Sequence, residues 1–356
     1  MRPACAVLDA GALRTNLEVV RRHAPGARVM AVAKANGYGH GLVFAARALE
    51  NADAFGVASL EEGLELREAG IRQKICLLEG FFDPAEIGAL IEFGLDPVLH
   101  EDYQVEALER ASPEGPLDVW VKIDTGMHRL GFPVERLREV VGRVRALHGV
   151  RAIGVMSHLA CADEQDSPAT ASQISLFSST CNGDFTTSLA NSAGILRWPG
   201  SHGDWVRPGL MLYGASPMAS QMGEQLGLAP VMTLKSRLIS VRTRAQGEAI
   251  GYGGTYRCPQ RMEVGVVAIG YGDGYPRELA PGTPVRIHDR LAPIIGRVSM
   301  DMLTIDLRQV PEARVGDEVV LWGKGLPVER IAQAANTIPY TLLCGLTQRL
   351  PRRQAA

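Results

Sequence analysis

Short apolar runs alternate with longer amphipathic stretches from about Arg28 to Leu212, and this alternation constrains the fold more than any other feature of the chain. Apolar runs rich in β-branched residues are typical of buried parallel strands, and apolar residues at spacings of three and four are typical of covering helices. Eight strands are predicted, at residues 29–34, 54–58, 74–78, 96–99, 118–123, 153–157, 187–189 and 206–212. Eight repeats favour a closed (β/α)8 TIM barrel.

Helical patterns separate several of these strands. The apolar spacing predicts helices over residues 60–70, 83–94, 101–111 and 134–147. Near Pro230 the pattern changes to short alternating runs punctuated by Gly, Pro and Asp, which indicates a mostly β domain over residues 231–356 after a barrel over residues 1–230. Within the second domain we expect one short helix at 328–335, and we expect the apolar run at 5–10 to add a strand to its sheet.

The composition excludes several classes of protein. Hydrophobic residues make up 46% of the chain, charged residues 21%, and the net charge is -2, which is typical of an ordinary globular protein without a nucleic-acid-binding surface. The basic run of Arg349, Arg352 and Arg353 is interpreted as a solvated end. No stretch of eighteen apolar residues predicts a membrane span, and the first residues lack the apolar core of an export signal.

Cysteine usage bears on metal binding and on the cellular compartment. The six cysteines lie far apart, without a CxxC pair and without a nearby histidine at metal-ligand spacing. We therefore expect no metal site. In a chain of this length we also expect reduced thiols in the cytoplasm rather than a disulfide framework.

Polar residues stand at or just after the carboxyl ends of the predicted barrel strands, where barrel enzymes carry their working residues. They are Lys34, Lys122, Asp124, Arg129, Ser157, His158, Asn191, Ser192 and Arg207. A lysine at a strand end can simply extend its amine to the rim. A lysine that is desolvated among arginines instead loses proton affinity and becomes a nucleophilic amine, so the cluster favours Schiff-base chemistry on Lys34.

Nine spaced segments resemble the alanine racemase family. AVAKANGYGHG at residues 31–41 is similar to the family's cofactor-attachment motif, in which the lysine forms a Schiff base with pyridoxal phosphate. The match continues in family order through KIDTGMHRLGF (122–132), GVMSHLACAD (154–163), LANSAG (189–194), VRPGLMLYG (206–214), IGYGGTY (250–256), IGYGDGYPR (269–277), GRVSMDM (296–302) and IPYTLLC (338–344). The departures, such as Gly37 and Gly272 where alanine is usual, remove no functional side chain.

The resemblance implies a homodimeric racemase of alanine with two catalytic bases. Lys34 corresponds to the cofactor-binding lysine and to one base, and Tyr252 corresponds to the opposing base, which family members take from the partner subunit. Racemisation needs proton-transfer groups on opposite faces of a planar carbanion, and a lysine and a tyrosine can provide them. A tyrosine with an ordinary pKa near ~10 needs cationic neighbours or a histidine to act as a base, and His158 and Arg207 are the candidates.

The resemblance also implies the cofactor contacts, which are Lys34, Tyr38, His158, Asn191, Ser192, Arg207, Gly209, Leu210 and Tyr340. Hydroxyls and backbone N–H groups of this set would hold the phosphate without further lysines. Arg207 corresponds to the arginine that faces the pyridine nitrogen. A guanidinium donates a hydrogen bond but keeps its proton, which weakens the electron sink and favours racemisation over transamination. An ion pair with a carboxylate such as Asp204 is the alternative role for Arg207.

Arg129 is implied to bind the substrate carboxylate. Lys122, near it in sequence, matches a lysine that is carbamylated in many family members, and a carbamate would supply a fixed negative charge that orients Arg129. The alternative is an unmodified Lys122 that pairs with Asp124 or with a bound anion, because a modification cannot be derived from sequence.

The substrate gate is implied at Tyr271, Tyr340 and Met300. Two tyrosines there would leave room for little more than a methyl side chain, which suits alanine. The polar outer rim of the entry corridor is implied at Asp163, Arg277 and Arg297. Exposed charges near any cleft look the same in a sequence, so a plain surface role is the alternative for these three.

Two other functions share parts of this pattern. A barrel-plus-β-domain amino-acid decarboxylase also binds the cofactor through a lysine, but it places an acid at the pyridine nitrogen, where this chain has Arg207. A non-catalytic carrier of pyridoxal phosphate resembles the barrel alone and lacks the β domain that contains Tyr252. The sequence leaves open whether the racemase would supply D-alanine for the cell wall or serve alanine breakdown.

Overall fold

Eight parallel strands close into a barrel in the computed structural model, which describes residues 2–112 and 115–355. The order around the barrel is β5-β4-β3-β2-β10-β9-β8-β6, and pairing of β5 with β6 closes it. The strands are β2 (Arg28–Val32), β3 (Ala54–Val57), β4 (Lys74–Leu77), β5 (Leu95–Leu99), β6 (Leu117–Asp124), β8 (Val150–Met156), β9 (Thr186–Ser188) and β10 (Trp205–Val206), and the short β7 (Phe132–Pro133) adds to β6. The predicted (β/α)8 barrel is confirmed.

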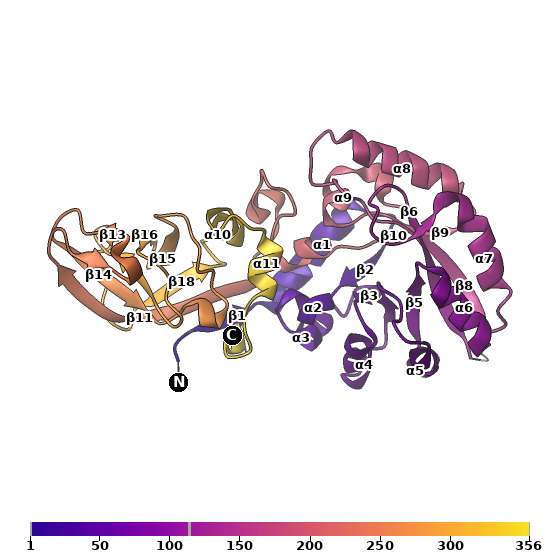
Figure 1. Cartoon of the computed structure of the whole chain (residues 1–356), viewed down its shortest axis with the longest axis horizontal. Helices are drawn as coiled ribbons and strands as arrows, with labels where there is room; N and C mark the ends of the chain where they lie inside the picture. Colours follow the sequence, from indigo (N-terminus) through magenta and orange to yellow (C-terminus); the bar gives the residue numbers. More distant parts are fainter. Residues whose placement is uncertain (1, 113–114, 356) are drawn as a thin grey trace.

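Helices cover the outside of the barrel (Figure 1). They are α1 (Ala10–His23), α3 (Leu42–Ala48), α4 (Leu60–Glu68), α5 (Ile87–Phe93), α6 (Asp102–Ala111), α7 (Leu137–Arg145), α8 (Pro168–Cys181) and α9 (Ser192–Arg197). All four predicted helices are present, as α4 to α7. Among the residues that the structure describes, no helix is both long and apolar enough to cross a membrane.

The barrel interior is filled by alternate residues of the strands, because side chains of a strand point to opposite faces with a period of two. One interior cluster consists of Met30, Ala54, Cys76, Val98, Trp120, Met156 and Trp205. This apolar layer separates two polar ends. The carboxyl end of the strands forms the mouth, and the amino end carries a second group of charged residues.

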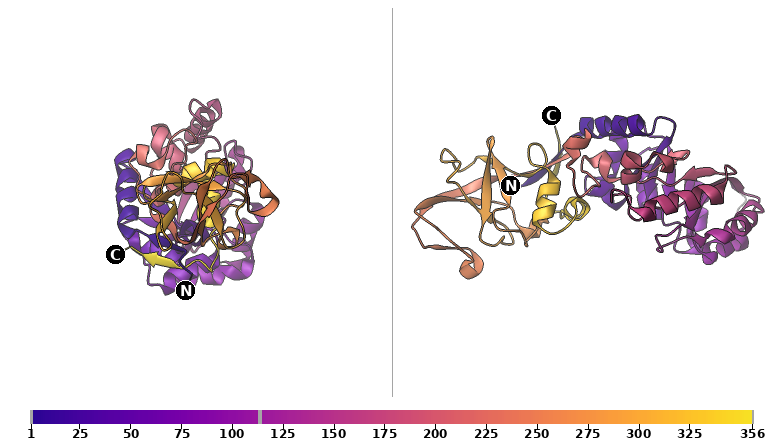
Figure 2. Two further views of the ribbon diagram at one scale, coloured as in Figure 1. Left: turned by 90° about the vertical axis from the view of Figure 1, so that its left-hand side faces the viewer. Right: turned by 90° about the horizontal axis from the view of Figure 1, so that it is seen from above.

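The mostly β domain forms the other lobe of the elongated molecule (Figures 1 and 2). Its sheet has the order β14-β17-β16-β15-β18-β11-β1-β19, with an additional pairing between β14 and β11. The strands are β1 (Cys5–Leu8), β11 (Met232–Arg244), β14 (Met262–Val267), β15 (Pro284–Ile287), β16 (Arg290–Ile295), β17 (Leu303–Asp306), β18 (Glu318–Trp322) and β19 (Arg352–Gln354), and β12 (Ala249–Ile250) pairs with β13 (Tyr256–Arg257) as a separate hairpin. The prediction that the first apolar run joins this sheet is confirmed, because β1 pairs antiparallel with β11.

Several sequence predictions about the β domain and the last barrel strand were wrong. The domain contains a second helix, α11 (Pro339–Cys344), besides the expected α10 (Val328–Ala334). The predicted strand at 206–212 ends at Val206, because Pro208 has no N–H to donate to the ladder, and residues 210–213 form a 3₁₀ turn. The basic C-terminal run is not a free end, since Arg352 lies in β19 and Arg349 forms ion pairs with Asp273 and Asp301.

Candidate active site at the barrel mouth

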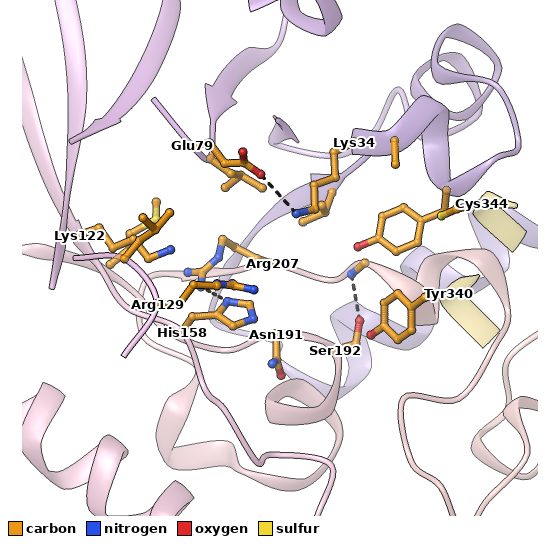
Figure 3. A pocket seen from close by; sticks show the side chains of 17 residues that line it. Lys34, Glu79, Lys122, Arg129, His158, Asn191, Ser192, Arg207, Tyr340 and Cys344 are labelled. Carbon is orange, nitrogen blue, oxygen red and sulfur yellow. Dashed lines mark hydrogen bonds and ion pairs between the residues drawn. The ribbon is translucent and has the colours of Figure 1, made fainter. Parts of the chain in front are cut away.

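A pocket of about 630 Å³ opens at the carboxyl ends of the barrel strands. Ten of the residues singled out from the sequence line it, and Figure 3 shows most of them pointing toward one another: Lys34, Tyr38, Lys122, Arg129, His158, Asn191, Ser192, Arg207, Gly209 and Tyr340. They come from segments that are far apart in the chain, so the fold brings together what the sequence only suggested.

Lys34 lies on a left-handed turn rather than at the end of a strand. Strand β2 ends at Val32, and the next segment, α2 (Lys34–Tyr38), has positive φ angles at Ala35, Asn36, Gly37 and Tyr38. L-residues avoid this conformation, which costs roughly 1–2 kcal/mol per residue, so the surrounding structure must hold it. The backbone N–H of Gly37 donates to the carbonyl of Ala33 at 2.7 Å.

A buried histidine supports the same turn. The Nδ1 atom of His40 lies 2.9 Å from the carbonyl oxygen of Tyr38 and 3.1 Å from that of Gly37. Burial lowers the pKa of His40 to about 4, so its ring is neutral and Nδ1 can carry the proton that these two carbonyls accept. These contacts stabilise the strained backbone of the turn and so fix the position of the backbone that carries the Lys34 side chain.

The prediction that Lys34 is desolvated was wrong for this chain by itself. Its side chain is 39% exposed, and its amine lies 4.0 Å from the carboxylate of Glu79 (Figure 3). The reason is the left-handed turn, which carries Lys34 beyond the strand end and lets the amine project into the open mouth. The buried lysine of the site is Lys122.

Lys122 and Arg129 form a positively charged side of the pocket with Arg207. Lys122 is 8% exposed, and burial, followed by the charges of Arg207 and Arg129, lowers its pKa to about 8. The alternative pairing of Lys122 with Asp124 is not found, because the Asp124 carboxylate accepts hydrogen bonds from His128 and from backbone N–H groups. The arrangement therefore concentrates positive charge where an anionic ligand can lie.

Arg207 and His158 contact each other inside the mouth. Arg207 is 4% exposed, and its guanidinium donates to Oγ of Ser188 at 2.6 Å and to Nδ1 of His158 at 3.3 Å. Burial lowers the pKa of Arg207 to about 10, which still leaves it protonated at neutral pH. Burial and the charge of Arg207 hold the pKa of His158 well below its usual value, so His158 is neutral and its proton lies on Nε2. The alternative role of Arg207, a pair with Asp204, is not found, because Asp204 accepts from Thr187.

Uncharged donors converge on one corner of the pocket. The N–H of Gly209 donates to Oγ of Ser192 at 2.9 Å, and a Cβ atom on Gly209 would lie only 2.3 Å from the hydroxyl of Tyr38. Tyr340 joins them from α11, with its ring 5.8 Å from that of Tyr38. Burial raises the pKa of both tyrosines, that of Tyr340 to about 12, so their hydroxyls keep their protons. Leu210, fully buried, follows Gly209 directly.

This corner suits a phosphate group. Hydroxyls and a backbone N–H at a glycine can surround a dianion closely, and the absence of a side chain on Gly209 lets the Tyr38 hydroxyl lie next to this backbone. Asn191 takes a supporting part, because its side-chain oxygen accepts from the N–H of Gly194 at 3.0 Å and caps helix α9. The whole mouth therefore combines an amine, several fixed cations and a set of hydrogen-bond donors that suit a phosphate, which we call the phosphate donors.

The remaining predicted residues do not enter the pocket of their own chain. Tyr252 is 70% exposed on the turn between β12 and β13, and the label β13 marks the end of the β domain farthest from the barrel (Figure 1). Within its own chain it contacts neither His158 nor Arg207 among the described residues, so the support expected from these two stays a prediction about the tyrosine of a second chain. Tyr271 and Met300 are 39% and 53% exposed. The three corridor residues are also exposed: Asp163, Arg277 and Arg297.

Sequence reasoning missed two polar residues of the mouth. Glu79 directly follows the predicted strand at 74–78, so the same strand-end rule that selected Lys34 could have found it. Cys344 lines the pocket from α11, a helix that the apolar pattern did not predict.

The opposite end of the barrel holds a smaller cavity of about 120 Å³. Asp96 is 8% exposed there, and burial raises its pKa to about 7. Beside it, the amine of Lys74 lies 2.6 Å from the carboxylate of Asp118. Because barrel enzymes carry their working residues at the carboxyl ends of the strands, this end is interpreted as structural.

Family models and curated relatives match the chain over nearly its full length. The family model described as "Alanine racemase, N-terminal domain" matches residues 8–217, and the one described as "Alanine racemase, C-terminal domain" matches residues 231–354. A curated alanine racemase of Nitrosococcus oceani is 51% identical over 348 residues, covering 98% of each chain, and one of Shewanella loihica is 50% identical over 347 residues, covering 97% of each.

Solved structures agree with the sequence matches. The biosynthetic alanine racemase of Pseudomonas aeruginosa has a TM-score of 0.97 at 46% identity and covers 100% of both chains. The alanine racemase of Bartonella henselae, described with covalently bound pyridoxal phosphate, has a TM-score of 0.89 at 27% identity and also covers 100% of both chains.

Proposed function

Because the chain belongs to the alanine racemase family, we propose that the pocket at the barrel mouth is the site where it interconverts L- and D-alanine, with Lys34 as the cofactor-binding residue. The racemase activity and the dependence on pyridoxal phosphate follow from the family, and neither the decarboxylase nor the carrier is favoured. The observation that carries the proposal is the convergence of Lys34 with Arg207 and the phosphate donors in one pocket.

The residues of the mouth fit pyridoxal phosphate. Tyr38, Ser192, Tyr340 and the backbone at Gly209 would hold the phosphate, and Arg207 would face the pyridine nitrogen. When bound, the cofactor supplies an electron-withdrawing ring that stabilises negative charge at the substrate Cα. Arg207 is protonated at neutral pH and can only donate, so it favours a ring nitrogen without a proton and moderates that electron withdrawal.

Two groups are proposed to move the Cα proton. Lys34 acts on one face, and its amine is free to reach the substrate because the side chain projects into the mouth. Tyr252 acts on the other face. Since Tyr252 is 70% exposed on the β domain of the same chain, it would have to come from a second chain, which is the reason for proposing a homodimer with shared sites.

We propose that His158 assists the partner's Tyr252. Because Nδ1 of His158 accepts from Arg207, its Nε2 carries the proton and is free to donate. A donor beside the phenol oxygen stabilises the deprotonated form and lowers the pKa of a tyrosine, as a general base requires.

Arg129 is proposed to bind the substrate carboxylate, and Lys122 to carry a carbamate that orients it. Carbamylation joins a neutral lysine amine to carbon dioxide and releases one proton. The lowered pKa of Lys122, about 8, supports this step, because a much larger fraction of the amine is neutral near pH 8 than for an ordinary lysine.

The partner's Tyr271 and Met300 are proposed to form the substrate gate together with Tyr340 of the mouth. The corridor outside it is assigned to Asp163, Arg277 and Arg297. Tyr271 and Met300 are exposed on the same β domain as Tyr252. This supports the proposal that one subunit supplies both Tyr252 and these gate residues to the other subunit's pocket.

The division into a barrel domain and a β domain near residue 230 is supported by the fold. The match to the N-terminal family model ends at residue 217, and the match to the C-terminal model begins at residue 231. The long strand β11 begins at Met232. We also assign the enzyme to the cytoplasm, which the six free cysteines support, since such thiols stay reduced there.

Borohydride reduction tests the assignment of Lys34. Reduction should fix the cofactor irreversibly on the lysine that binds it, and peptide mapping should find it on Lys34. The exposed Lys324 of the β domain serves as the internal control, because a merely reactive cofactor would label it as well. A cofactor found mainly on any lysine other than Lys34 would overturn the proposal.

A further inference from the structure

Two loops of the β domain, residues 270–274 and 299–302, lie against each other through their backbones. We call them the gate loops, because they carry Tyr271 and Met300. The N–H of Gly272 donates to the carbonyl of Met300 at 2.8 Å, and a second bond of 3.1 Å joins the N–H of Tyr271 to the other loop. The separation of the two gate side chains therefore depends on what holds these loops together.

Arg349 bridges the gate loops with its side chain. Its Nε atom donates to Oδ1 of Asp273 at 2.8 Å, and its Nη2 atom donates to Oδ1 of Asp301 at 2.8 Å and to the carbonyl oxygen of Met300 at 3.4 Å. Asp273 belongs to one gate loop and is 1% exposed, whereas Asp301 belongs to the other and follows Met300 directly. One planar guanidinium thus donates to both loops, which a lysine cannot do with the same fixed geometry.

The neighbourhood leaves this guanidinium little freedom. A Cβ atom on Gly272 would lie 2.8 Å from Nη2 of Arg349, so the glycine provides the space that the bridge occupies. The hydroxyl of Thr347, two residues before Arg349, donates to the carbonyl of Gly272 at 3.1 Å. Arg2 donates to the second oxygen of Asp273 at 2.8 Å and to the carbonyl oxygen of Asp301 at 3.2 Å, so a second, half-exposed arginine supports the same two loops from the other side.

We propose that Arg349 is a positioning residue that determines amino-acid specificity: by joining the gate loops it fixes the separation of Tyr271 and Met300, and so limits the side chain that the gate admits. This inference rests on the proposed function, in which the two residues face the partner's pocket. Arg349 has no contact with substrate in this account and acts only through the gate.

The expected effect follows from the size of the groups involved. In a closed pocket one methylene group changes kcat/KM by roughly 10–200-fold, so a gate that is loosened but not removed should change discrimination by about 3–10-fold. The test measures kcat and KM of the holoenzyme for alanine, serine and 2-aminobutyrate. Arg349→Met should raise the KM for alanine and raise kcat/KM for the two larger amino acids relative to alanine.

Arg308→Met is the matched control. Arg308 also pairs with a buried aspartate of the β domain, Asp306, at 2.6 Å, and its side chain is 38% exposed, close to the 39% of Arg349. It lies outside the gate loops. Its replacement should cost comparable stability and leave the ratio of kcat/KM values unchanged. An equal change of this ratio in both variants would mean general loosening of the domain and would overturn the inference.

Two further variants keep the test decisive. Arg349→Lys should restore part of the discrimination, because an ammonium can keep one ion pair. Asp301→Asn weakens the 2.8 Å pair with Arg349 and the longer 3.5 Å pair with Arg2, and it leaves both bonds to Asp273 in place. It should therefore shift the ratio in the same direction even if Arg349→Met does not fold. Unchanged discrimination in both of these variants would contradict the role of Arg349.

Tyr271→Ala separates this inference from the function on which it rests. If Tyr271→Ala widens the substrate range while the Arg349 and Asp301 variants do not, Tyr271 belongs to the gate and only the role of Arg349 is wrong. If Tyr271→Ala also leaves the substrate range unchanged, the gate itself is misassigned and both proposals fail.

Discussion

The two ends of the barrel show the same physical effect with opposite consequences. At the mouth, burial lowers the pKa of Lys122 to about 8, and at the other end burial raises the pKa of Asp96 to about 7. Both pKa shifts have the same cause, because removal from water disfavours the charged form of each group. A shifted pKa in a barrel therefore does not by itself identify the active site.

What differs between the ends is charge balance and space. At the amino end of the strands, which we call the lower end, Lys74 forms an ion pair with Asp118, and the cavity measures about 120 Å³. At the mouth, four cations face a cavity of about 630 Å³: Lys34, Lys122, Arg129 and Arg207. Within residues 2–112 and 115–355, Glu79 is the single carboxylate that lines this cavity. Excess charge of one sign around open space indicates a site prepared for an anionic ligand.

Replacing Lys34 should have the largest effect. Lys34→Ala should lower kcat by at least about 10⁴-fold, because it removes both the covalent attachment and one proton-transfer group. Loss of the absorbance of the bound cofactor, followed with the racemase rate, checks this. Lys324→Ala should behave like the unaltered enzyme. Residual activity above one per cent in Lys34→Ala would contradict the assignment of the active site to the mouth.

Replacing Arg207 should have the next largest effect. Arg207→Glu allows the ring nitrogen to hold a proton and also leaves Oγ of Ser188 without its donor, so racemisation should fall by roughly 10²-fold or more. Transamination should rise relative to racemisation, which the amount of pyruvate formed per turnover measures. Arg207→Lys retains the charge and should not raise this ratio. A normal ratio in Arg207→Glu would argue against the role of Arg207.

Replacing Lys122 should change substrate binding more than turnover. Lys122→Arg keeps a positive charge but cannot be carbamylated, so the KM for alanine should rise by about 10-fold with a smaller change in kcat. The pH dependence has a definite sign. With a pKa of about 8, the amine is about half neutral at pH 8 and ~1% neutral at pH 6, so carbamate formed from labelled bicarbonate should increase over that range. A ¹³C carbamate signal that is absent at pH 8 would contradict the proposal for Lys122.

Replacing Asp96 should have the smallest effect on activity and a clear effect on stability. Its pKa is about 7 in the folded chain and 3.8 as the ordinary value, so the folded state binds more protons between these pH values. The free energy of unfolding should therefore fall as pH rises through this window, by at most roughly 4 kcal/mol. Asp96→Asn should lose this dependence and be more stable than the unaltered enzyme at pH 8. A large loss of racemase activity in Asp96→Asn would mean that the lower end is not merely structural.

The sequence predicted the barrel because the apolar alternation reports burial directly. Every predicted barrel strand has a counterpart, and strand-end position was enough to bring Lys34, Lys122, His158 and Arg207 to one mouth. The register of side chains along a strand has a fixed period of two, so a correct strand also gives the correct inward face.

The local conformation of Lys34 could not be predicted in the same way. The left-handed turn after β2 depends on contacts with distant residues, and a Cβ atom on Gly39 would lie 2.0 Å from the carbonyl oxygen of Leu343 in α11. Helix α11 itself has only six residues, too few to show a periodic pattern. Exposure of Tyr252 is likewise a property of the folded chain and not of the GYGGTY segment.

The most direct test of the account is to form hybrid dimers from two inactive variants. If each site takes Lys34 from one subunit and Tyr252 from the other, Lys34→Ala and Tyr252→Ala should each be nearly inactive alone. Equal amounts refolded together should give hybrids in about half of the dimers, each with one intact site, and recover about a quarter of the original activity. A mixture that stays inactive although hybrids have demonstrably formed would contradict a site shared between subunits.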